Sequence, residues 1–342
     1  MRWPRPTRRT LLGGGLAAAG LAAFGLHRVS ARPPVPDGPV RLNVEARRID
    51  AFRPGDPGRQ RFGSLVFRGG LQLRASYEGF GGFSGLAFAD DGRLVAISDA
   101  AEWLVARPER QGDRLVGLAE AVMAPMLAGN GVPLAATSAY DTESLTIAGG
   151  SAYVGVERVH QVLKFDWARS GVTARAERIA VPAEARRLPR NRGLEAIGVA
   201  PRGSPVAGAI VAIAERSGED ETAGFIIGGR RPGRFALSRR DGFDVTDLAF
   251  LPGGDLIVLE RRYVPPLSIA MRIRHIEGRA LVPGAVLDGA ALIEADNGYE
   301  IDNMEGLAVR RSVAGETILT VISDNNFSMM QRTLLLEFVL AS

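Results

Sequence analysis

Five short apolar runs of the sequence begin with side chains that could bind a cation or move a proton. The runs SGLAF, ESLTI, EAIGV, DLAFL and EGLAV start at Ser84, Glu143, Glu195, Asp247 and Glu305. Their starts lie 59, 52, 52 and 58 residues apart. Carboxylates bind hard cations such as Ca²⁺, and they also act as general acids and bases. Either chemistry requires a fold that brings these distant positions together.

A second acidic residue closes the next apolar run, 13 to 20 residues after each start. These residues are Asp99, Glu157, Glu215, Glu260 and Asp324, and Arg158, Arg216, Arg261 and Asn325 each follow one of them. Two of the links between the runs, 90–92 (DDG) and 252–254 (PGG), have the composition of tight hairpin turns. The pattern therefore predicts five β-hairpins that carry acids at defined positions.

Weaker strand-like runs follow each hairpin, so the repeat is a unit of about four strands in roughly 50 residues. The apolar runs are short and are bounded by Gly or Pro, which disfavours helices. The pattern is typical of an all-β chain folded as a single β-propeller of five or six four-stranded blades. The C-terminal run 332–340 has no successor, so we expect run 64–76 to complete the last blade. Run 41–52 is the candidate for a sixth blade.

The innermost strand of each propeller blade lines the central channel, so the acids that open the hairpins should form a ring there. Three interpretations of this ring are open. Each acid could pair with an arginine of a neighbouring blade. The ring could instead hold a cation, and the lack of Cys with only three His favours oxygen-bound Ca²⁺ over Zn²⁺. In the third interpretation the carboxylates act as acids and bases without a metal.

The ring and its flanking residues supply the candidate site. The candidate metal ligands are Glu143, Glu195, Asp247, Glu305, Asp324 and Asn325. The candidate catalytic residues are Glu195, Glu305 and Arg192, because Asn191 and Asn303 place an amide shortly before each acid. The candidate substrate-binding residues are Arg158, Arg216 and Arg261, since guanidinium groups bind anionic oxygens in bidentate fashion.

Residues 1–31 have the composition of a twin-arginine export signal, followed by an N-terminal segment at 32–61 and the propeller domain at 62–342. Arg8 and Arg9 precede a Gly/Ala-rich apolar run at 11–26, which is shorter than a membrane span. Without the five arginines of residues 1–31, which contain no acid, the formal net charge falls from +4 to −1. The basic pI is therefore no evidence for nucleic-acid binding. We expect a periplasmic or secreted protein that meets the membrane only during export.

Several segments together resemble the phytase-like family of exported bacterial propellers, described as having esterase-like activity of phytase. They are 81–99 (GGFSGLAFADDGRLVAISD), 141–147 (DTESLTI), 191–197 (NRGLEAI), 244–263 (DVTDLAFLPGGDLIVLERRY), 303–309 (NMEGLAV) and 320–338 (TVISDNNFSMMQRTLLLEF). The resemblance extends from about residue 62 to 338. It implies a hydrolase that acts on phosphoesters or esters, with Ca²⁺ as a cofactor and a small anionic or ester substrate.

Two other functions fit the same sequence. One is a monomeric, non-catalytic propeller that binds a ligand or partner in the periplasm, with its acids used for pairing between blades. The other is a lactonase-like hydrolase, a propeller class that also binds calcium through scattered acids. A serine nucleophile is disfavoured, because the glycines around Ser84 do not have the spacing of a nucleophile elbow. We expect His160 and His275 to have packing or surface roles.

Overall fold

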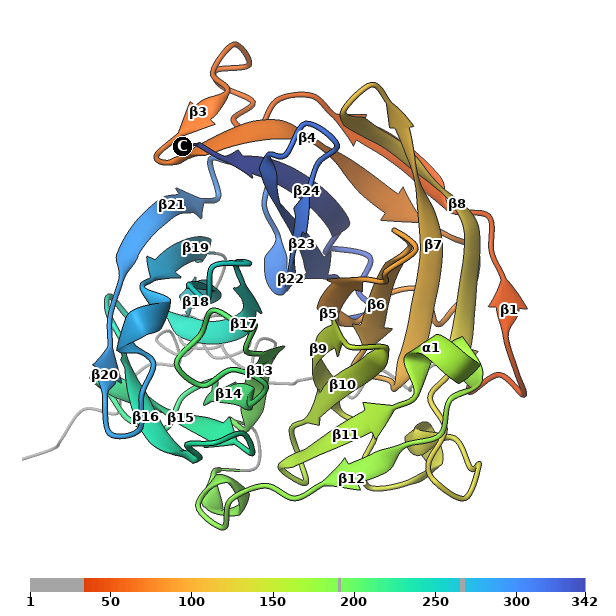
Figure 1. Ribbon diagram of the computed structural model, residues 1–342. Helices are drawn as coiled ribbons and strands as arrows, with labels where there is room; N and C mark the ends of the chain where they lie inside the picture. The colour runs from red at the N-terminus through yellow and green to blue at the C-terminus, as the bar shows by residue number, and fades with distance from the viewer. Residues whose placement is uncertain (1–33, 190–191, 265–267, 342) are drawn as a thin grey trace, which may run out of the picture. The chain divides into compact units, whose positions relative to one another are not determined.

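The computed structural model describes residues 34–189, 192–264 and 268–341, and the expected export signal lies outside them. Within this part of the chain the strands form five sheets, which surround a common centre as the blades of a propeller (Figure 1). The all-β propeller prediction is confirmed, with five blades in the described residues. None of the described helices is long and apolar enough to cross a membrane.

The innermost strand of each blade is one of the five predicted runs. These strands are β5 (Phe83–Phe88), β9 (Thr142–Ala148), β13 (Leu194–Val199), β17 (Asp244–Phe250) and β22 (Asn303–Arg311). Each contacts the inner strand of the next blade, and β22 contacts β5, so the ring is closed. Blades cover both faces of each inner strand, which explains why these runs are almost continuously apolar.

The remaining strands follow outward in chain order within the first four blades. The second strands are β6 (Leu94–Ser98), β10 (Ser151–Val156), β14 (Ile210–Ala214), β18 (Leu256–Val264) and β23 (Thr317–Asp324). The third are β7 (Glu102–Gln111), β11 (Gln161–Phe165), β15 (Glu221–Ile227), β19 (Ser268–Ile276) and β24 (Thr333–Leu340). The fourth are β8 (Arg114–Pro125), β12 (Glu177–Ile179), β16 (Gly233–Ser238), β21 (Ala290–Asp296) and, in the fifth blade, β4 (Leu65–Arg74).

The fifth blade is completed from the N-terminal side, as the sequence predicts. β4 pairs antiparallel with the C-terminal strand β24, and Leu65 faces Leu340. The prediction that run 41–52 seeds a sixth blade is wrong. Its two short strands, β1 (Val40–Arg41) and β2 (Glu45–Ile49), add to the outer edges of existing blades instead, β1 to β8 and β2 to β4. We call β1 and β2 the clasp, because they join the first blade to the fifth.

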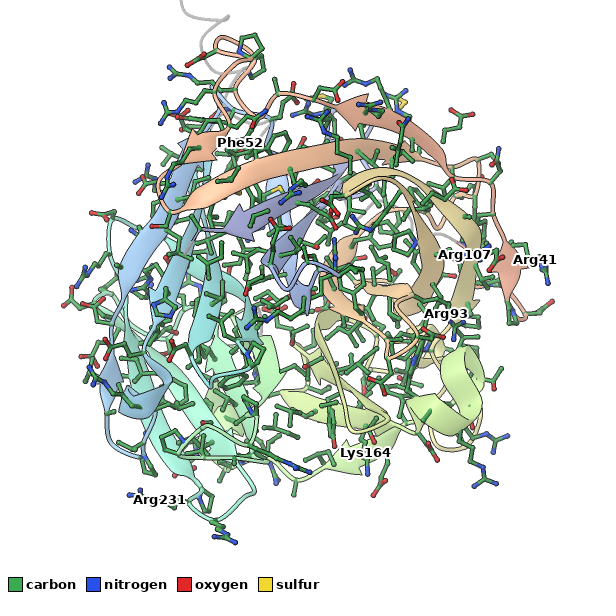
Figure 2. All side chains as sticks on the ribbon, turned by 45° about the horizontal axis from the view of Figure 1, so that its top comes forward. Arg41, Phe52, Arg93, Arg107, Lys164 and Arg231 are labelled. Atoms are coloured by element: carbon green, nitrogen blue, oxygen red, sulfur yellow. The ribbon has the colours of Figure 1, made fainter. Side chains whose placement is uncertain are left out.

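The hydrophobic core consists of clusters between adjacent blades. Phe52 lies in the largest of these clusters beside β4, and its ring meets that of Phe338 edge-on at 5.0 Å (Figure 2). Charged side chains such as Arg107 and Arg231 point outward. The core therefore stacks the blades around the channel.

Each inner strand contains a β-bulge at its second or third residue, where one residue has no partner on the second strand. The unpaired residues are Ser84, Glu143, Glu195, Thr246 and Glu305. A bulge turns its side chain away from the regular alternation of the strand. In the fourth blade the unpaired residue is Thr246. The prediction that placed Asp247 in the ring is therefore wrong by one residue.

The opposite end of the channel has a different lining. Four residues beyond each bulge stands a half-buried apolar side chain, in the set Phe88, Ile147, Val199, Phe250 and Val309. We call this set the apolar collar. It lines a cavity of about 220 Å³ together with neighbouring residues of all five inner strands. The two ends of the channel thus differ in chemistry, with acids near the bulges and apolar groups at the collar.

Candidate functional site

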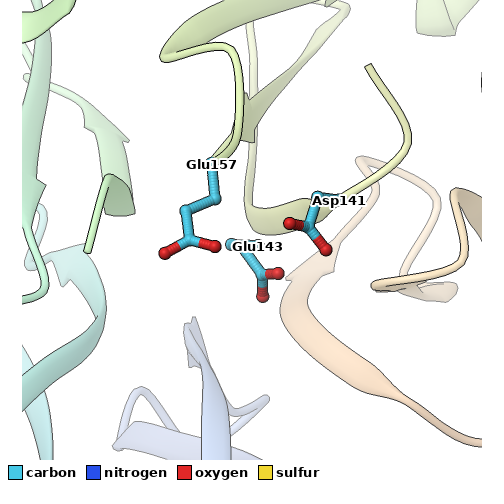
Figure 3. Close-up of side chains that lie close together, drawn as sticks. All are labelled: Asp141, Glu143 and Glu157. Atoms are coloured by element: carbon cyan, nitrogen blue, oxygen red, sulfur yellow. The ribbon is translucent and has the colours of Figure 1, made fainter. Parts of the chain in front are cut away.

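The bulges bring acids from three blades to one end of the channel, which we call the acidic mouth. Carboxylate oxygens of Asp141, Glu143 and Glu157 lie within 4.8 Å of one another, and those of Glu157, Glu195 and Glu215 do so as well. Figure 3 shows Asp141, Glu143 and Glu157 directed toward a common point. Glu157 belongs to both groups. The mouth therefore gathers more negative charge than an ordinary hydrogen-bonded cluster holds.

The acids of the mouth have raised pKa values, because burial penalises their charged forms. Burial raises the pKa of Glu143 and of Glu195 well above the usual range, and neighbouring carboxylates raise both further. Burial also raises the pKa of Glu157, Glu305 and Asp324 to about 7. Without a cation, part of the mouth is therefore protonated near neutral pH.

Arg261 occupies in the fourth blade the place that an acid occupies in the others. In the fourth blade Val245 pairs with Glu260 beside the bulge, and Arg261 is the next residue along the chain. Glu157 and Glu215 have the same position in the second and third blades. Its guanidinium donates to Asn303 Oδ1 at 2.5 Å and to the Glu305 carboxylate. A longer contact of 3.5 Å reaches Glu215 Oε1. Arg261 therefore neutralises one side of the mouth.

Asn303 connects Arg261 to the fifth blade. Its Nδ2 donates to Glu305 Oε1 at 2.8 Å, and its distance to Asp324 Oδ2 is 3.5 Å. Asp324 also accepts a hydrogen bond from Asn326 N at 2.6 Å. Glu305 is thus held by an arginine and an amide, which distinguishes it from Glu143 and Glu195.

Two acids of the predicted pattern have structural roles. Asp247 is fully buried, and its two oxygens accept hydrogen bonds from Leu248 N at 2.8 Å and Leu307 N at 2.7 Å. It joins the inner strands of the fourth and fifth blades. Glu260 is buried between two guanidinium groups, from Arg272 at 2.7 Å and Arg274 at 2.6 Å.

Asn325 binds backbone amides through its side-chain oxygen. Its Oδ1 accepts hydrogen bonds from Gly82 N and Phe327 N, both at 3.1 Å. It therefore holds two loops together at the mouth, one before β5 and one after β23, while Asp324 beside it is held by Asn326.

The other predicted arginines lie around the mouth. Arg158 donates to Asp141 Oδ2 at 2.8 Å and lies over the Tyr140 ring at 4.8 Å. Arg216 donates through Nε to Asp244 Oδ1 at 2.8 Å. Arg192 is exposed, and Asn191 lies outside the described residues.

Sequence reasoning missed Asp141 altogether and did not count Glu157 or Glu215 as ligands. The signal for Glu157 and Glu215 was present, because both close the second strand of their hairpins. Asp141 precedes Glu143 by two residues, which puts both side chains on one face of an extended segment. A register that allowed for the bulge would have grouped these acids.

Ser84, His160 and His275 each have a hydrogen-bond partner in the structure, and the packing or surface roles of the two histidines stay predictions. Ser84 Oγ donates to the Thr142 carbonyl at 2.5 Å. His160 is buried with Nε2 2.9 Å from Leu188 O, and it packs against Gly193, where a side chain would collide with it. His275 is half-buried, with Nε2 2.9 Å from Asp255 Oδ2.

Comparisons with known proteins found two kinds of similarity, to solved structures and to a family model. Among solved structures, the chain is similar to a PQQ-bound aldose sugar dehydrogenase from Streptomyces coelicolor, at 12% identity and a TM-score of 0.42, over 90% of this chain and 99% of that one. It is also similar to glutaminyl cyclase from Myxococcus xanthus, at 11% identity and a TM-score of 0.38, over 75% and 90% of the two chains. No curated protein matches the chain. Residues 78–327, most of the propeller, match the model of the phytase-like family, described as "esterase-like activity of phytase", and the chain belongs to that family.

Proposed function

We propose that the protein hydrolyses an ester or phosphoester at the acidic mouth with the help of a bound Ca²⁺ ion. The observation that carries this proposal is the pair of carboxylate groups that share Glu157. Buried acids at such distances need protons, arginines or a cation as compensation. Arg261 contacts Glu305 and Glu215, and Arg158 contacts Asp141.

The donor set fits Ca²⁺ better than a softer metal. The groups contain only carboxylates, which are hard oxygen ligands, and calcium accepts six to eight such oxygens in flexible geometry. Asp141, Glu143, Glu157, Glu195 and Glu215 would hold the ion. When bound, it would polarise the ester or phosphoryl oxygen as a Lewis acid.

The remaining residues of the mouth supply the other roles. Glu305 is held by Arg261 and Asn303, so its carboxylate is positioned to take a proton from the attacking water. Arg192 is exposed, and Arg158 and Arg216 follow the second strands of the second and third blades. These guanidinium groups would hold the anionic part of the substrate. We also propose that the chain acts as a monomer after export through its signal at 1–31.

Calcium binding is tested by thermal unfolding of the purified protein in EDTA and in millimolar CaCl₂. An ion that binds only the native state stabilises it by about 2.7 kcal/mol at 100 times Kd, so the melting temperature should rise by several degrees. Glu157→Gln and Glu195→Gln should abolish the rise. Glu177→Gln, in the exposed outer strand β12, is the matched control and should keep it. An equal rise in all variants would place the ion elsewhere.

Catalysis is tested on nitrophenyl esters and phosphates in CaCl₂. Glu305→Gln should lower kcat by on the order of 10²-fold or more, because a general base is lost, while the calcium-dependent rise in melting temperature remains. If wild-type protein turns over none of these substrates yet binds calcium, the non-catalytic propeller that binds a ligand becomes the better explanation. Turnover of lactones alone would favour the lactonase-like activity.

A further inference from the structure

Two methionines stand fully exposed in a loop that begins at the acidic mouth. Met329 and Met330 lie in the loop between β23 and β24 and are 104% and 82% exposed. The loop begins directly after Asp324, which belongs to the mouth. Isolated exposed apolar residues are common, but two adjacent long side chains with almost no cover need a reason. We call Met329 and Met330 the apolar lip.

The start of the loop is held in a strained conformation. Asn326 and Phe327 have φ values of 49° and 48°, a left-handed conformation that is unfavourable for a bulky side chain such as Phe. Their amides donate to the side chains of the two preceding residues, to Asp324 Oδ1 at 2.6 Å and to Asn325 Oδ1 at 3.1 Å. The loop is therefore fixed to the mouth where it begins.

The end of the loop is fixed as well. Arg332 N donates to Asp302 Oδ2 at 3.0 Å, and Gln331 Nε2 donates to Asp302 Oδ1 at 3.4 Å. The Arg332 guanidinium also donates to Glu300 Oε2 at 2.6 Å. Asp302 immediately precedes Asn303, which binds Glu305. The lip thus lies between two anchored ends of the loop. One end is bonded to Asp324, and the other is bonded to Asp302, which precedes Asn303.

These contacts hold the lip in place without covering it, and a strained, anchored loop is a common feature of ligand-binding sites. Residues 325–331 (NNFSMMQ) carry no charge, although the mouth next to them is strongly acidic. Methionine suits apolar groups of varied shape, because its side chain is flexible and polarisable. The site therefore offers polar groups and an apolar surface side by side.

We propose that the substrate is amphiphilic, an ester or phosphoester whose alkyl or aryl group lies on Met329 and Met330 while its polar group lies in the mouth. This inference rests on the proposed hydrolysis and names the class of substrate. The length of the alkyl chain should affect binding through the lip alone.

Kinetics with nitrophenyl acetate and nitrophenyl octanoate test the inference. Wild-type protein should have the higher kcat/KM for octanoate, and the double variant Met329→Ser/Met330→Ser should reduce the ratio of octanoate to acetate by on the order of tenfold, the effect of uncovering about two methylene groups. Val313→Ser is the matched control. Val313 is 109% exposed, but it precedes β23 and so lies at the far end of that strand. A ratio unchanged in the double variant overturns the inference.

A binding measurement keeps the test independent of turnover. Octylphosphonate should bind more tightly than methylphosphonate in CaCl₂ by calorimetry, and the excess should vanish in the double variant while binding of methylphosphonate is kept. If Glu305→Gln loses all hydrolysis but still binds octylphosphonate more tightly than methylphosphonate, the lip binds the alkyl chain independently of the catalytic step. The proposed substrate class is then supported separately from the proposed hydrolysis. If the double variant instead changes only the oligomeric state or the binding to neutral phosphatidylcholine vesicles, the lip serves a second copy or a membrane and the inference is wrong.

Discussion

Arg261 determines how charge is distributed at the mouth. It stands where the second and third blades have Glu157 and Glu215, and it pairs with Glu305 and Asn303. A built-in cation on this side leaves the excess of negative charge on the second and third blades. Under the proposed function, the acids around Glu157 would therefore hold the calcium ion, and Glu305, held by Arg261 and Asn303, would act on the water molecule.

Asp247 should matter for stability alone. An asparagine has one acceptor oxygen, so Asp247→Asn leaves the amide of Leu248 or Leu307 without its partner in the buried core. We expect a loss of about 1–3 kcal/mol in the free energy of unfolding, measured by urea denaturation. The calcium-dependent rise in melting temperature should stay the same. A normal stability with a lost calcium response would return Asp247 to the metal site.

Glu102 should make stability depend on pH. Burial raises its pKa to about 7 from an ordinary value of 4.5, although the Tyr77 hydroxyl donates to it at 2.8 Å. Between these values the native state binds more protons than the unfolded state, so the free energy of unfolding falls as pH rises. Below pH 4.5 Glu102 is protonated in both the native and the unfolded state, and its contribution to the free energy of unfolding is fully present.

Glu102→Gln should remove this part of the pH dependence, on the order of 2 kcal/mol between pH 4.5 and 7. Urea denaturation at several pH values in EDTA measures it. Glu109→Gln, at an exposed position of the same strand, is the control and should leave the slope unchanged. The acids of the mouth also have raised pKa values and keep their own part of the slope. A slope in Glu102→Gln equal to that of the wild type would therefore contradict the role of Glu102.

At the level of elements, the inner hairpins could be predicted because their apolar runs, turns and spacing repeat. The closing role of β4 followed from the unpaired C-terminal run. The clasp could not be predicted, since β1 and β2 together contain only seven residues in strands and carry no repeat signal. The bulge also could not be predicted from the sequence, because the unpaired residue is not always of the same amino-acid type. For this reason the acid Asp247 was aligned with the ring in place of Thr246.

The clasp should stabilise the first and fifth blades. Deletion of residues 34–50 removes the ladders to β8 and β4 and the hydrogen bond from Arg47 Nη2 to Gln72 Oε1 at 2.7 Å. At about 1 kcal/mol for each hydrogen bond, the free energy of unfolding should fall by several kcal/mol. Hydrogen exchange should then be faster in β8 and β4 than in β14 of the third blade. Uniform exchange rates would show that the clasp contributes nothing local.

For the whole molecule, the ends of the channel determine how a ligand reaches the site. The acidic mouth attracts cations, and the apolar collar at the other end offers no charged side chain among its five residues. An ion or charged substrate should therefore enter and leave through the mouth, because crossing the collar would strip its hydration. The loops around the mouth, including the apolar lip, then control access to the site.

The pairing of β4 with β24 also determines when the protein can complete its folding. Arg74 and Thr333 are separated by 259 residues, so the partner of β4 is made last. At synthesis rates of about 5–20 residues per second, β4 waits for on the order of 15–50 seconds after it emerges. During that time its edge is open to pairing with other chains. The first blades can fold during translation, but the ring can close only after the final strand has left the ribosome.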